Sequence, residues 1–299
     1  MPLSMREMTC VTCGKKDYTV KYEARVPDAG SLNFSARREG LRSHPRIVEC
    51  SGCGQIYSNP YFADDVISKL YQEANYLDEP QLNNMVKDYM CEFQRAIAGR
   101  DKSSLRILEV GCGDGFFLKA LKQAGYEKIT GVEPGREAVS RAEPDIRACI
   151  INDFFDSKMF EEGSFDIVCC FQIMDHLPNP AAFVAAVHGI LAADGVFLAI
   201  NHNIRARLPK LLGERSPMYD IEHIYLFDCS TMSRLLKNAQ FSVSRCEPIS
   251  NSYTVDYALK MFPFPHKIKR GLISMASSLG LAAVSLNVSA GNMVTVARR

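Results

Sequence analysis

One stretch near residue 110 constrains the fold more than any other part of the 299-residue chain. Residues 105–110 are a short apolar run of strand length, the glycine-rich turn Gly111-Cys-Gly-Asp-Gly115 follows, and a helical pattern begins at Phe116. A strand, a glycine turn and a helix form the first unit of a doubly wound α/β sheet. The glycines let a ligand approach the backbone, and the start of the helix presents free N–H groups to it.

The second strand and the glycine spacing indicate the kind of ligand. Residues 128–132 form a second strand that ends in Glu133, whose carboxylate can accept two hydrogen bonds from a ribose diol. The dinucleotide fingerprint is G-x-G-x-x-G, whereas this chain has G-x-G-x-G, with Glu109 two residues before Gly111 and Phe116 where the third glycine is expected. The turn therefore suits a nucleoside whose 5′ substituent is not a diphosphate.

Residues 109–115 and 131–134 resemble motif I and the acidic loop of class I S-adenosylmethionine (SAM) methyltransferases. Residues 152–154, 164–177 and 191–200 resemble the later segments of that family. The resemblance implies an α/β, Rossmann-like fold with a seven-stranded, mostly parallel sheet and one reversed strand near the C-terminal edge. Residues 241–247 and 292–297 are the candidates for the last two strands.

The same resemblance implies roles for individual residues. The turn would pass under the methionine part of SAM, the carboxylate after the second strand would hold the ribose, an acidic residue and a neighbouring aromatic ring would frame the adenine, and a further ring would line the sulfonium side. For the two aromatic rings, plain core packing is an equal alternative. The implied cofactor-binding residues are Glu109, Gly111, Gly113, Glu133, Asp153, Phe154 and Phe171.

Two C-x-x-C-G motifs near the N-terminus predict a metal site. Cys10 and Cys13 form the first pair, Cys50 and Cys53 form the second, and each pair is followed by a glycine that permits a positive φ. Four thiolates are the closed tetrahedral set that structural Zn²⁺ prefers. A redox dithiol and a chance pairing are the alternatives to zinc.

Composition and charge limit the classes of partner that we expect for this chain. The chain has 35 Lys and Arg against 34 Asp and Glu, a formal net charge of +1, so binding of nucleic acid by charge alone is not expected. The N-terminus lacks an apolar signal core, and the 11 Cys are compatible with reduced thiols, so we expect a cytoplasmic protein. The uncharged residues 271–297 are too polar for a membrane span, although the basic residues 267–270 could lie on a membrane surface.

The pattern along the chain predicts three parts. Residues 1–60 form the zinc-ribbon module, residues 61–103 form a helical connector or lid, and residues 104–299 form the SAM-binding domain. Insertions that would shape the acceptor site lie at about 201–230 and 248–291.

Glu222-His223, followed by Phe227, resembles the E-H-x-x-x-F element of small-molecule methyltransferases. Deoxysugar C-methyltransferases have a similar element, in which a Tyr and a His act on the sugar, and they also carry an N-terminal four-cysteine zinc module. The resemblance implies that His223 is the catalytic base, helped by Tyr219 and Glu222, although three residues separate Tyr219 from His223 instead of two. An unperturbed histidine pKa of about 6.5 suits this role. The alternative is that His223 caps the helix that follows Asp228.

These observations predict a SAM-dependent methyltransferase with a structural zinc ribbon. The expected acceptor is a small hydroxylated molecule, namely a sugar on a nucleotide or lipid carrier in polysaccharide or secondary-metabolite biosynthesis. A zinc-ribbon RNA methyltransferase and a non-catalytic protein that binds SAM and zinc are the alternatives. The oligomeric state and the choice between oxygen, carbon and nitrogen as methyl acceptor stay open.

Overall fold

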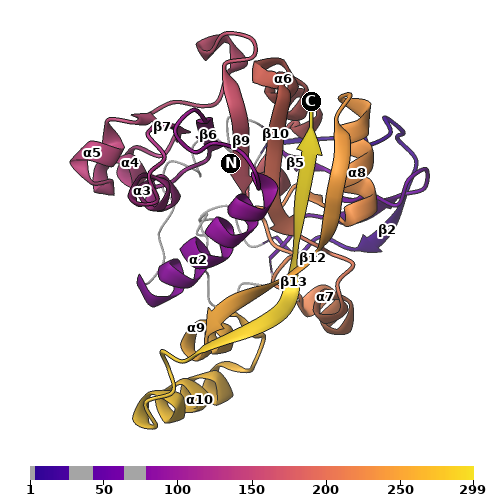
Figure 1. The fold of residues 1–299 in the computed structure, drawn as a ribbon. Helices are drawn as coiled ribbons and strands as arrows, with labels where there is room; N and C mark the ends of the chain where they lie inside the picture. The colour runs from indigo at the N-terminus through magenta and orange to yellow at the C-terminus, as the bar shows by residue number, and fades with distance from the viewer. Residues whose placement is uncertain (1–3, 27–42, 64–78) are drawn as a thin grey trace.

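The central element of the fold is a seven-stranded sheet with the order β12-β13-β10-β9-β6-β7-β8 (Figure 1). The computed structural model describes residues 4–26, 43–63 and 79–299. Strand β13 runs antiparallel to both of its neighbours, and the remaining neighbouring pairs are parallel. The predicted fold, with one reversed strand near the C-terminal edge, is confirmed. The strands are β6 (Arg106–Val110), β7 (Lys128–Val132), β8 (Ile150–Ile151), β9 (Phe165–Phe171), β10 (Leu191–His202), β12 (Ser242–Thr254) and β13 (Ser285–Arg298).

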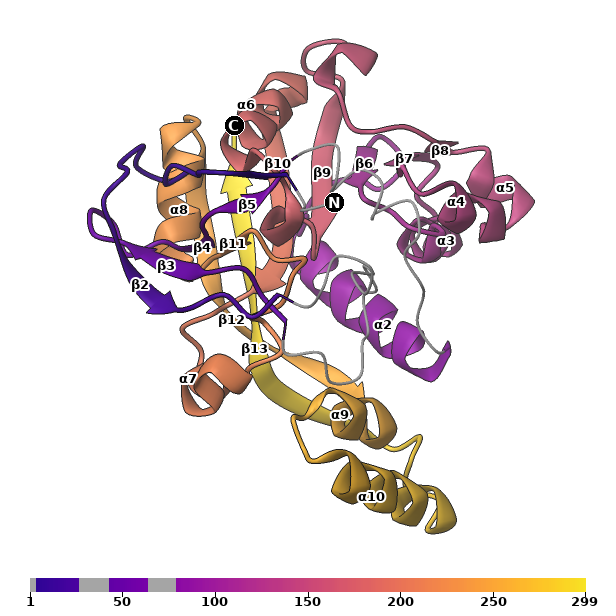
Figure 2. The same ribbon diagram turned by 180° about the vertical axis from the view of Figure 1, so that it is seen from behind.

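Two apolar cores cover the two faces of this sheet. Strands β6 and β9 lie in its middle and read as nearly continuous apolar runs, because helices cover parallel strands on both sides. Helices α2 (Glu79–Ala96) and α3 (Phe116–Gln123) supply one core, with Phe93 and Phe117 fully buried. Helices α6 (Pro180–Ile190) and α8 (Cys229–Asn238) supply the other core together with the N-terminal module (Figure 2).

Short helices connect these elements. They are α4 (Arg136–Arg141), α5 (Pro144–Arg147), α7 (Arg207–Leu212) and the 3₁₀ turns Ser157–Met159, Met174–His176 and Gly213–Arg215. Helix α8 begins with a capping box, in which the side chain of Asp228 accepts from the backbone N–H groups of Ser230 and Thr231. Asp228 therefore caps α8, so the alternative that His223 caps this helix is wrong.

The N-terminal module is built around a four-stranded sheet with the order β11-β4-β3-β2. Strands β2 (Tyr18–Tyr22), β3 (Ile47–Cys50) and β4 (Ile56–Ser58) come from the module. The fourth strand, β11 (Tyr225–Leu226), comes from the C-terminal part of the sequence and pairs with β4. Strand β1 (Met5–Arg6) pairs with β5 (Tyr61–Phe62), just past residue 60. The three-part division of the chain stays a prediction.

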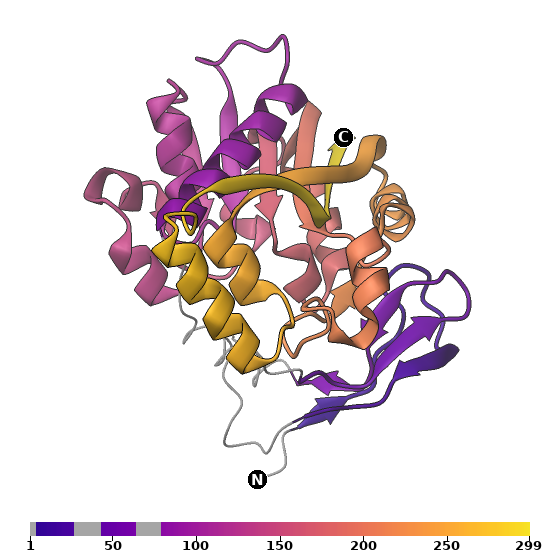
Figure 3. The ribbon, with the colours of Figure 1, turned by 90° about the horizontal axis from the view of Figure 1, so that it is seen from below.

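The last two strands extend well beyond the predicted residues. Past Asn251 and before Val288, these two strands pair only with each other among the described strands. They carry α9 (Val255–Met261) and α10 (His266–Ser278) away from the sheet (Figures 1 and 2), and the two helices lie side by side (Figure 3). The two ends of the predicted insertion at 248–291 are therefore continued strand, and helices α9 and α10 occupy most of the rest. Residues 64–78 of the predicted helical connector lie outside the described residues. No helix of the described ranges is long and apolar enough to cross a membrane.

Candidate functional site

The glycine-rich turn lies at the carboxyl end of β6, between β7 and β9. Gly111 has a φ of 75°, and its backbone N–H donates to the carbonyl of Val132 at 2.8 Å. A Cβ at this position would lie 2.4 Å from Cδ1 of Ile173, so the turn leaves no room for a side chain. Ile173 follows β9, and its contact with Gly111 brings the end of β9 against the turn.

Glu133 joins the end of β7 to this turn. Its Oε2 accepts from the backbone N–H of Gly113 at 2.9 Å, and its Oε1 accepts from Gly135 at 2.7 Å. Burial raises the pKa of Glu133, while the two N–H groups oppose that shift. Each carboxylate oxygen can accept more than one hydrogen bond, so the side chain can also accept from a ribose diol.

Glu109 lies in β6 directly before the turn and is 2% exposed. Its Oε2 has no hydrogen-bond partner in the described part of the protein. Burial, with a smaller effect of the Glu133 and Asp114 carboxylates, raises its pKa well above the usual value. The raised pKa favours the neutral form of Glu109, and a cationic ligand beside the glycine turn would favour its ionised form.

His223 lies in the segment before β11 and is 6% exposed. Its Nδ1 is 3.0 Å from Oδ1 of Asp220 and 3.1 Å from the carbonyl oxygen of Met218. Burial by itself would lower the pKa of His223, but Asp220, followed by Asp175 and Glu222, raises it to about 9. This imidazole therefore carries a proton at neutral pH.

Two more histidines surround His223. The His176 ring lies 4.7 Å from the His223 ring, and the His202 ring lies 4.9 Å from it, measured between centroids. Burial and the neighbouring His223 lower the pKa of His176 to about 4. Of these three histidines, the sequence singled out only His223 for catalysis. His202 ends β10 and His176 follows β9, and because β9 and β10 are adjacent parallel strands, both histidines lie at the same edge of the sheet.

The two residues that the resemblance implied would assist His223, Glu222 and Tyr219, do not both lie beside its ring. Glu222 is half-buried, and its backbone carbonyl lies 3.1 Å from Nδ1 of His176. Asp220, which the sequence did not single out, holds the His223 ring. The Tyr219 ring instead packs against Tyr22 of the N-terminal module, with ring centroids 5.1 Å apart.

The four predicted cysteines come together. Their sulfur atoms all lie within 4.8 Å of one another, with Cys10 to Cys53 at 3.4 Å and Cys13 to Cys50 at 3.5 Å. Four thiolates about 2.3 Å from one tetrahedral Zn²⁺ would be about 3.8 Å apart, so the set fits this ion. The glycines that follow, Gly14 and Gly54, have φ values of 71° and 74°, as predicted.

The module that carries these cysteines also holds the His223 segment. Strand β11 pairs with β4, the Ser58 hydroxyl donates to the carbonyl of His223 at 3.1 Å, and the Tyr61 hydroxyl donates to the carbonyl of Ile221 at 2.8 Å. Gln55 donates to the carbonyl of Leu226 at 3.0 Å. The module therefore holds the backbone of this segment through strand pairing and three side-chain hydrogen bonds.

A family profile described as "Methyltransferase domain" matches residues 82–245, more than half of the chain. The chain belongs to the methyltransferase-domain family. The class I SAM-dependent methyltransferase type predicted from the glycine turn is confirmed, whereas the deoxysugar subtype stays a prediction.

Curated relatives of this methyltransferase align with its central part. It is 28% identical over 144 residues to a ubiquinone biosynthesis O-methyltransferase of Actinobacillus pleuropneumoniae serotype 5b (strain L20). This alignment covers 44% of this chain and 59% of that protein. It is 33% identical over 117 residues to the enzyme of the same name from Pseudomonas aeruginosa (strain LESB58), covering 36% and 50%. The aligned stretch thus spans between half and three-fifths of these relatives.

Among solved structures, a putative methyltransferase from Bacillus halodurans C-125 shares the fold. The match has a TM-score of 0.51 and 18% identity, and covers 71% of this chain and 98% of that one. At this identity the likeness concerns the fold alone.

The predicted adenine and sulfonium residues of the methyltransferase differ in exposure. Phe154 is 47% exposed, so it is not packed in the core, and the adjacent Asp153 accepts from the Phe154 N–H at 2.7 Å. Phe171 is buried, with its ring stacked on Tyr89 at 4.3 Å. Core packing accounts for Phe171, while Phe154 is available to a ligand.

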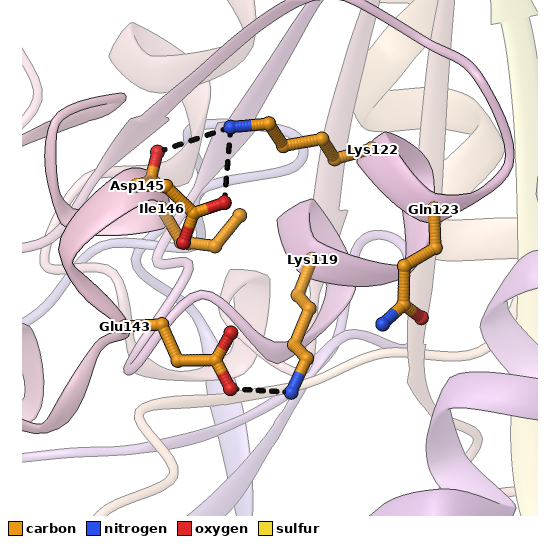
Figure 4. Close-up of a pocket in the computed structure, with 6 residues that line it drawn as sticks. All are labelled: Lys119, Lys122, Gln123, Glu143, Asp145 and Ile146. Carbon is orange, nitrogen blue, oxygen red and sulfur yellow. Dashed lines mark hydrogen bonds and ion pairs between the residues drawn. The ribbon is translucent and has the colours of Figure 1, made fainter.

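A cavity of about 270 Å³ lies elsewhere, between α3 and α5 (Figure 4). Lys119 pairs with Glu143 at 2.5 Å, and Lys122 pairs with Asp145 at 3.1 Å. Because its charges neutralise one another within the cavity, no ligand is indicated there.

Proposed function

We propose that this protein transfers the methyl group of SAM to a hydroxyl of a small molecule. The observation that carries the proposal is the contact of Ile173 with Gly111, because Ile173 precedes Asp175 and His176 by only a few residues. A nucleoside-binding turn and a cluster of three histidines therefore lie at the same edge of the sheet, where open α/β sheets bind their ligands.

On the donor side, we assign one or more residues to each part of SAM. Glu133 would accept from the ribose hydroxyls, and Glu109 would face the positively charged methionine part above Gly111 and Gly113. Asp153 and Phe154 would frame the adenine. When bound, SAM supplies a methyl group activated by a sulfonium.

On the acceptor side, amide and hydroxyl groups support a polyhydroxylated ligand. Asn292 pairs with His202 in the sheet register, and its Nδ2 lies 2.8 Å from Oδ1 of Asn251 and 3.2 Å from the Tyr253 hydroxyl. Such groups can exchange hydrogen bonds with sugar hydroxyls. We propose a sugar on a nucleotide or lipid carrier, with His223 contacting the acceptor.

A phenolic hydroxyl is the second candidate, because the curated relatives are O-methyltransferases named for ubiquinone biosynthesis. A phenol is more acidic than a sugar hydroxyl, so it would need less help in losing its proton. The two acceptors can be distinguished by direct assay.

Zinc would have a structural role. Four thiolates leave no open coordination position, and β4 of the same module supports the His223 segment. Tyr219 would help indirectly, by packing this segment against Tyr22.

Contact with a membrane surface also stays a proposal. Ile268 and Met275 of α10 are 53% and 56% exposed, and Lys267 and Arg270 lie on the same helix. These residues would suit the surface of anionic lipid vesicles if the sugar were carried on a lipid.

Calorimetry with SAM, followed by transfer of radiolabelled methyl from SAM to a panel of acceptors, tests the proposal. The panel contains nucleotide sugars, catechols and bulk RNA. We expect SAM binding and labelled sugar. Labelled RNA would favour the zinc-ribbon RNA methyltransferase, and SAM binding without any labelled product would favour a non-catalytic protein.

The variant His223→Ala should keep SAM binding and lose most turnover. His188, which packs against Phe241 outside the cluster, offers the matched control His188→Ala. Full activity of His223→Ala would remove His223 from the mechanism.

A further inference from the structure

The three histidines of the acceptor cluster have different partners, and these partners decide which ring can accept a proton. His223 faces Asp220 and carries a proton at neutral pH, while His176 is neutral and lies against the Glu222 carbonyl. His202, the last residue of β10, faces Asp175.

Asp175 is fully buried, and each of its carboxylate oxygens is engaged. Oδ2 lies 2.8 Å from Nδ1 of His202 and 3.4 Å from the His202 backbone N, while Oδ1 lies 3.4 Å from Nδ2 of Asn201. A hydrogen bond from Nδ1 of His202 to Oδ2 of Asp175 fits this distance, with the hydrogen on Nδ1. In the neutral ring, the lone pair is then on Nε2.

His202 is also the more open of the two histidines that face carboxylates. Its side chain is 26% exposed, whereas that of His223 is 8% exposed. His202 also lies at the edge of the sheet that carries the donor turn. Two residues before it, Ile200 pairs with Phe171 and accepts from the backbone N–H of Gln172 at 2.7 Å. Ile173, the next residue, is the one that touches Gly111.

We propose that His202 is the general base of the reaction and that Asp175 is its positioning residue, an inference that rests on the proposed methyl transfer. Nε2 of His202 takes the proton of the acceptor hydroxyl while the oxygen forms its bond to the methyl carbon. The bond between that carbon and the donor sulfur breaks, and its electron pair stays on sulfur. The products are a methyl ether, S-adenosylhomocysteine and an imidazolium that Asp175 stabilises.

The charged surroundings agree with this division of roles. Asp175, Asp220 and Glu222 are the carboxylates near the cluster, and His176 and His223 are the other rings that face it. Protonated His223 can donate a hydrogen bond to the acceptor oxygen but cannot accept its proton. This division of roles suits a hydroxyl compound, whose oxygen loses its proton to the base as the methyl ether forms.

Nitrogen-15 NMR of the histidine side chains tests the geometry without any acceptor. We expect neutral His202 to carry its hydrogen on Nδ1 in the full-length protein, with assignment by loss of the signal in His202→Gln. In Asp175→Asn the amide can donate to Nδ1, so the fixed tautomer should be lost. A neutral His202 with its hydrogen on Nε2 would overturn the proposal.

Kinetics test the chemistry with whichever acceptor of the panel is methylated. We expect His202→Gln to lower kcat by about 10²-fold or more, with the calorimetric Kd for SAM within about twofold of the wild type. His188→Gln is the matched control and should leave kcat unchanged. A kcat of His202→Gln close to that of the wild type, or turnover that requires added Mg²⁺, would overturn the role as base.

The two levels of inference fail differently. Absence of SAM binding by the wild-type protein would refute the proposed function. SAM binding with the wrong His202 tautomer would refute only the role of His202, and the NMR result decides this role even when no acceptor in the panel is methylated.

Discussion

Replacing Asp220 with Asn should remove a large, pH-dependent part of the stability of this protein. His223 has its usual pKa near 6.5 in the unfolded chain and about 9 in the folded protein. At roughly 1.4 kcal/mol for each pKa unit, this difference corresponds to about 3 kcal/mol of folding free energy. Asp220 is the main cause that raises the pKa, and its carboxylate lies 3.0 Å from Nδ1 of His223.

The sign of the effect follows from proton binding. Because folded His223 binds its proton more tightly, its contribution is fully present below pH 6.5 and is lost as the pH rises through about 9. Asn keeps the oxygen that accepts from the backbone N–H groups of Glu222 and His223, but it lacks the charge. The difference in unfolding free energy between wild type and variant should therefore be largest near pH 6.5 and shrink toward higher pH.

Urea unfolding of both proteins at several pH values between 6.5 and about 9 measures this difference. His176 does not confuse the result, since its pKa is lowered to about 4 and its effect appears only below pH 6.5. Glu137→Gln removes an exposed carboxylate paired with Arg141 and should change stability by less than about 0.5 kcal/mol at every pH. A constant difference between wild type and Asp220→Asn across this range would refute the reasoning.

Three further predictions concern the donor turn and the module. Gly111→Ala should weaken SAM binding at least about tenfold by calorimetry, because the alanine Cβ would lie 2.4 Å from Cδ1 of Ile173. Gly99→Ala is the control, because Gly99 has a similar φ of 83° but open space around it. Glu133→Gln should weaken SAM binding about tenfold, since one of two amide contacts is lost. Cys13→Ser should lose the zinc, measured by mass spectrometry, and most of its turnover, while SAM binding is kept. Cys91→Ser, at an exposed cysteine outside the cluster, should keep the zinc, the turnover and SAM binding. Unchanged SAM affinity in the first two variants, or full turnover without zinc, would contradict these expectations.

The sheet could be predicted from the sequence because each strand is recognisable from a short stretch of neighbouring residues. Residues 105–110 and 164–171 are apolar runs bounded by turns, and each glycine turn or helix start lies next to its strand in the chain. The cysteine site was equally accessible, since the spacing of two C-x-x-C-G motifs limits how the thiols can be arranged. In both cases, residues close in sequence carry the signal.

The acceptor site was harder to predict from the sequence, because it is formed by contacts between segments that lie far apart in the chain. Asp175 and His202 are 27 residues apart, and His223 comes from a third segment. The expected helper Tyr219 packs on Tyr22 instead, and Asp220 takes the place beside the imidazole. Adjacent residues in an irregular loop point in different directions, so a motif of Tyr, Glu and His does not by itself determine which of them meet.

The pairing of β11 with β4 gives the four-cysteine module a role in this methyltransferase, because the module supports the segment that carries His223. The segment from Ile221 to Phe227 has only a two-residue strand of its own, and a segment with so little regular structure is marginal without outside support. Gln55, Ser58 and Tyr61 each donate to a carbonyl of this segment, and all three follow Cys53 closely in the chain. Closing the four thiolates around one ion would fix β3 and β4, and through them the backbone that carries His223. The metal would thus act on the acceptor side at a distance, which is why zinc loss is expected to affect turnover and not SAM binding.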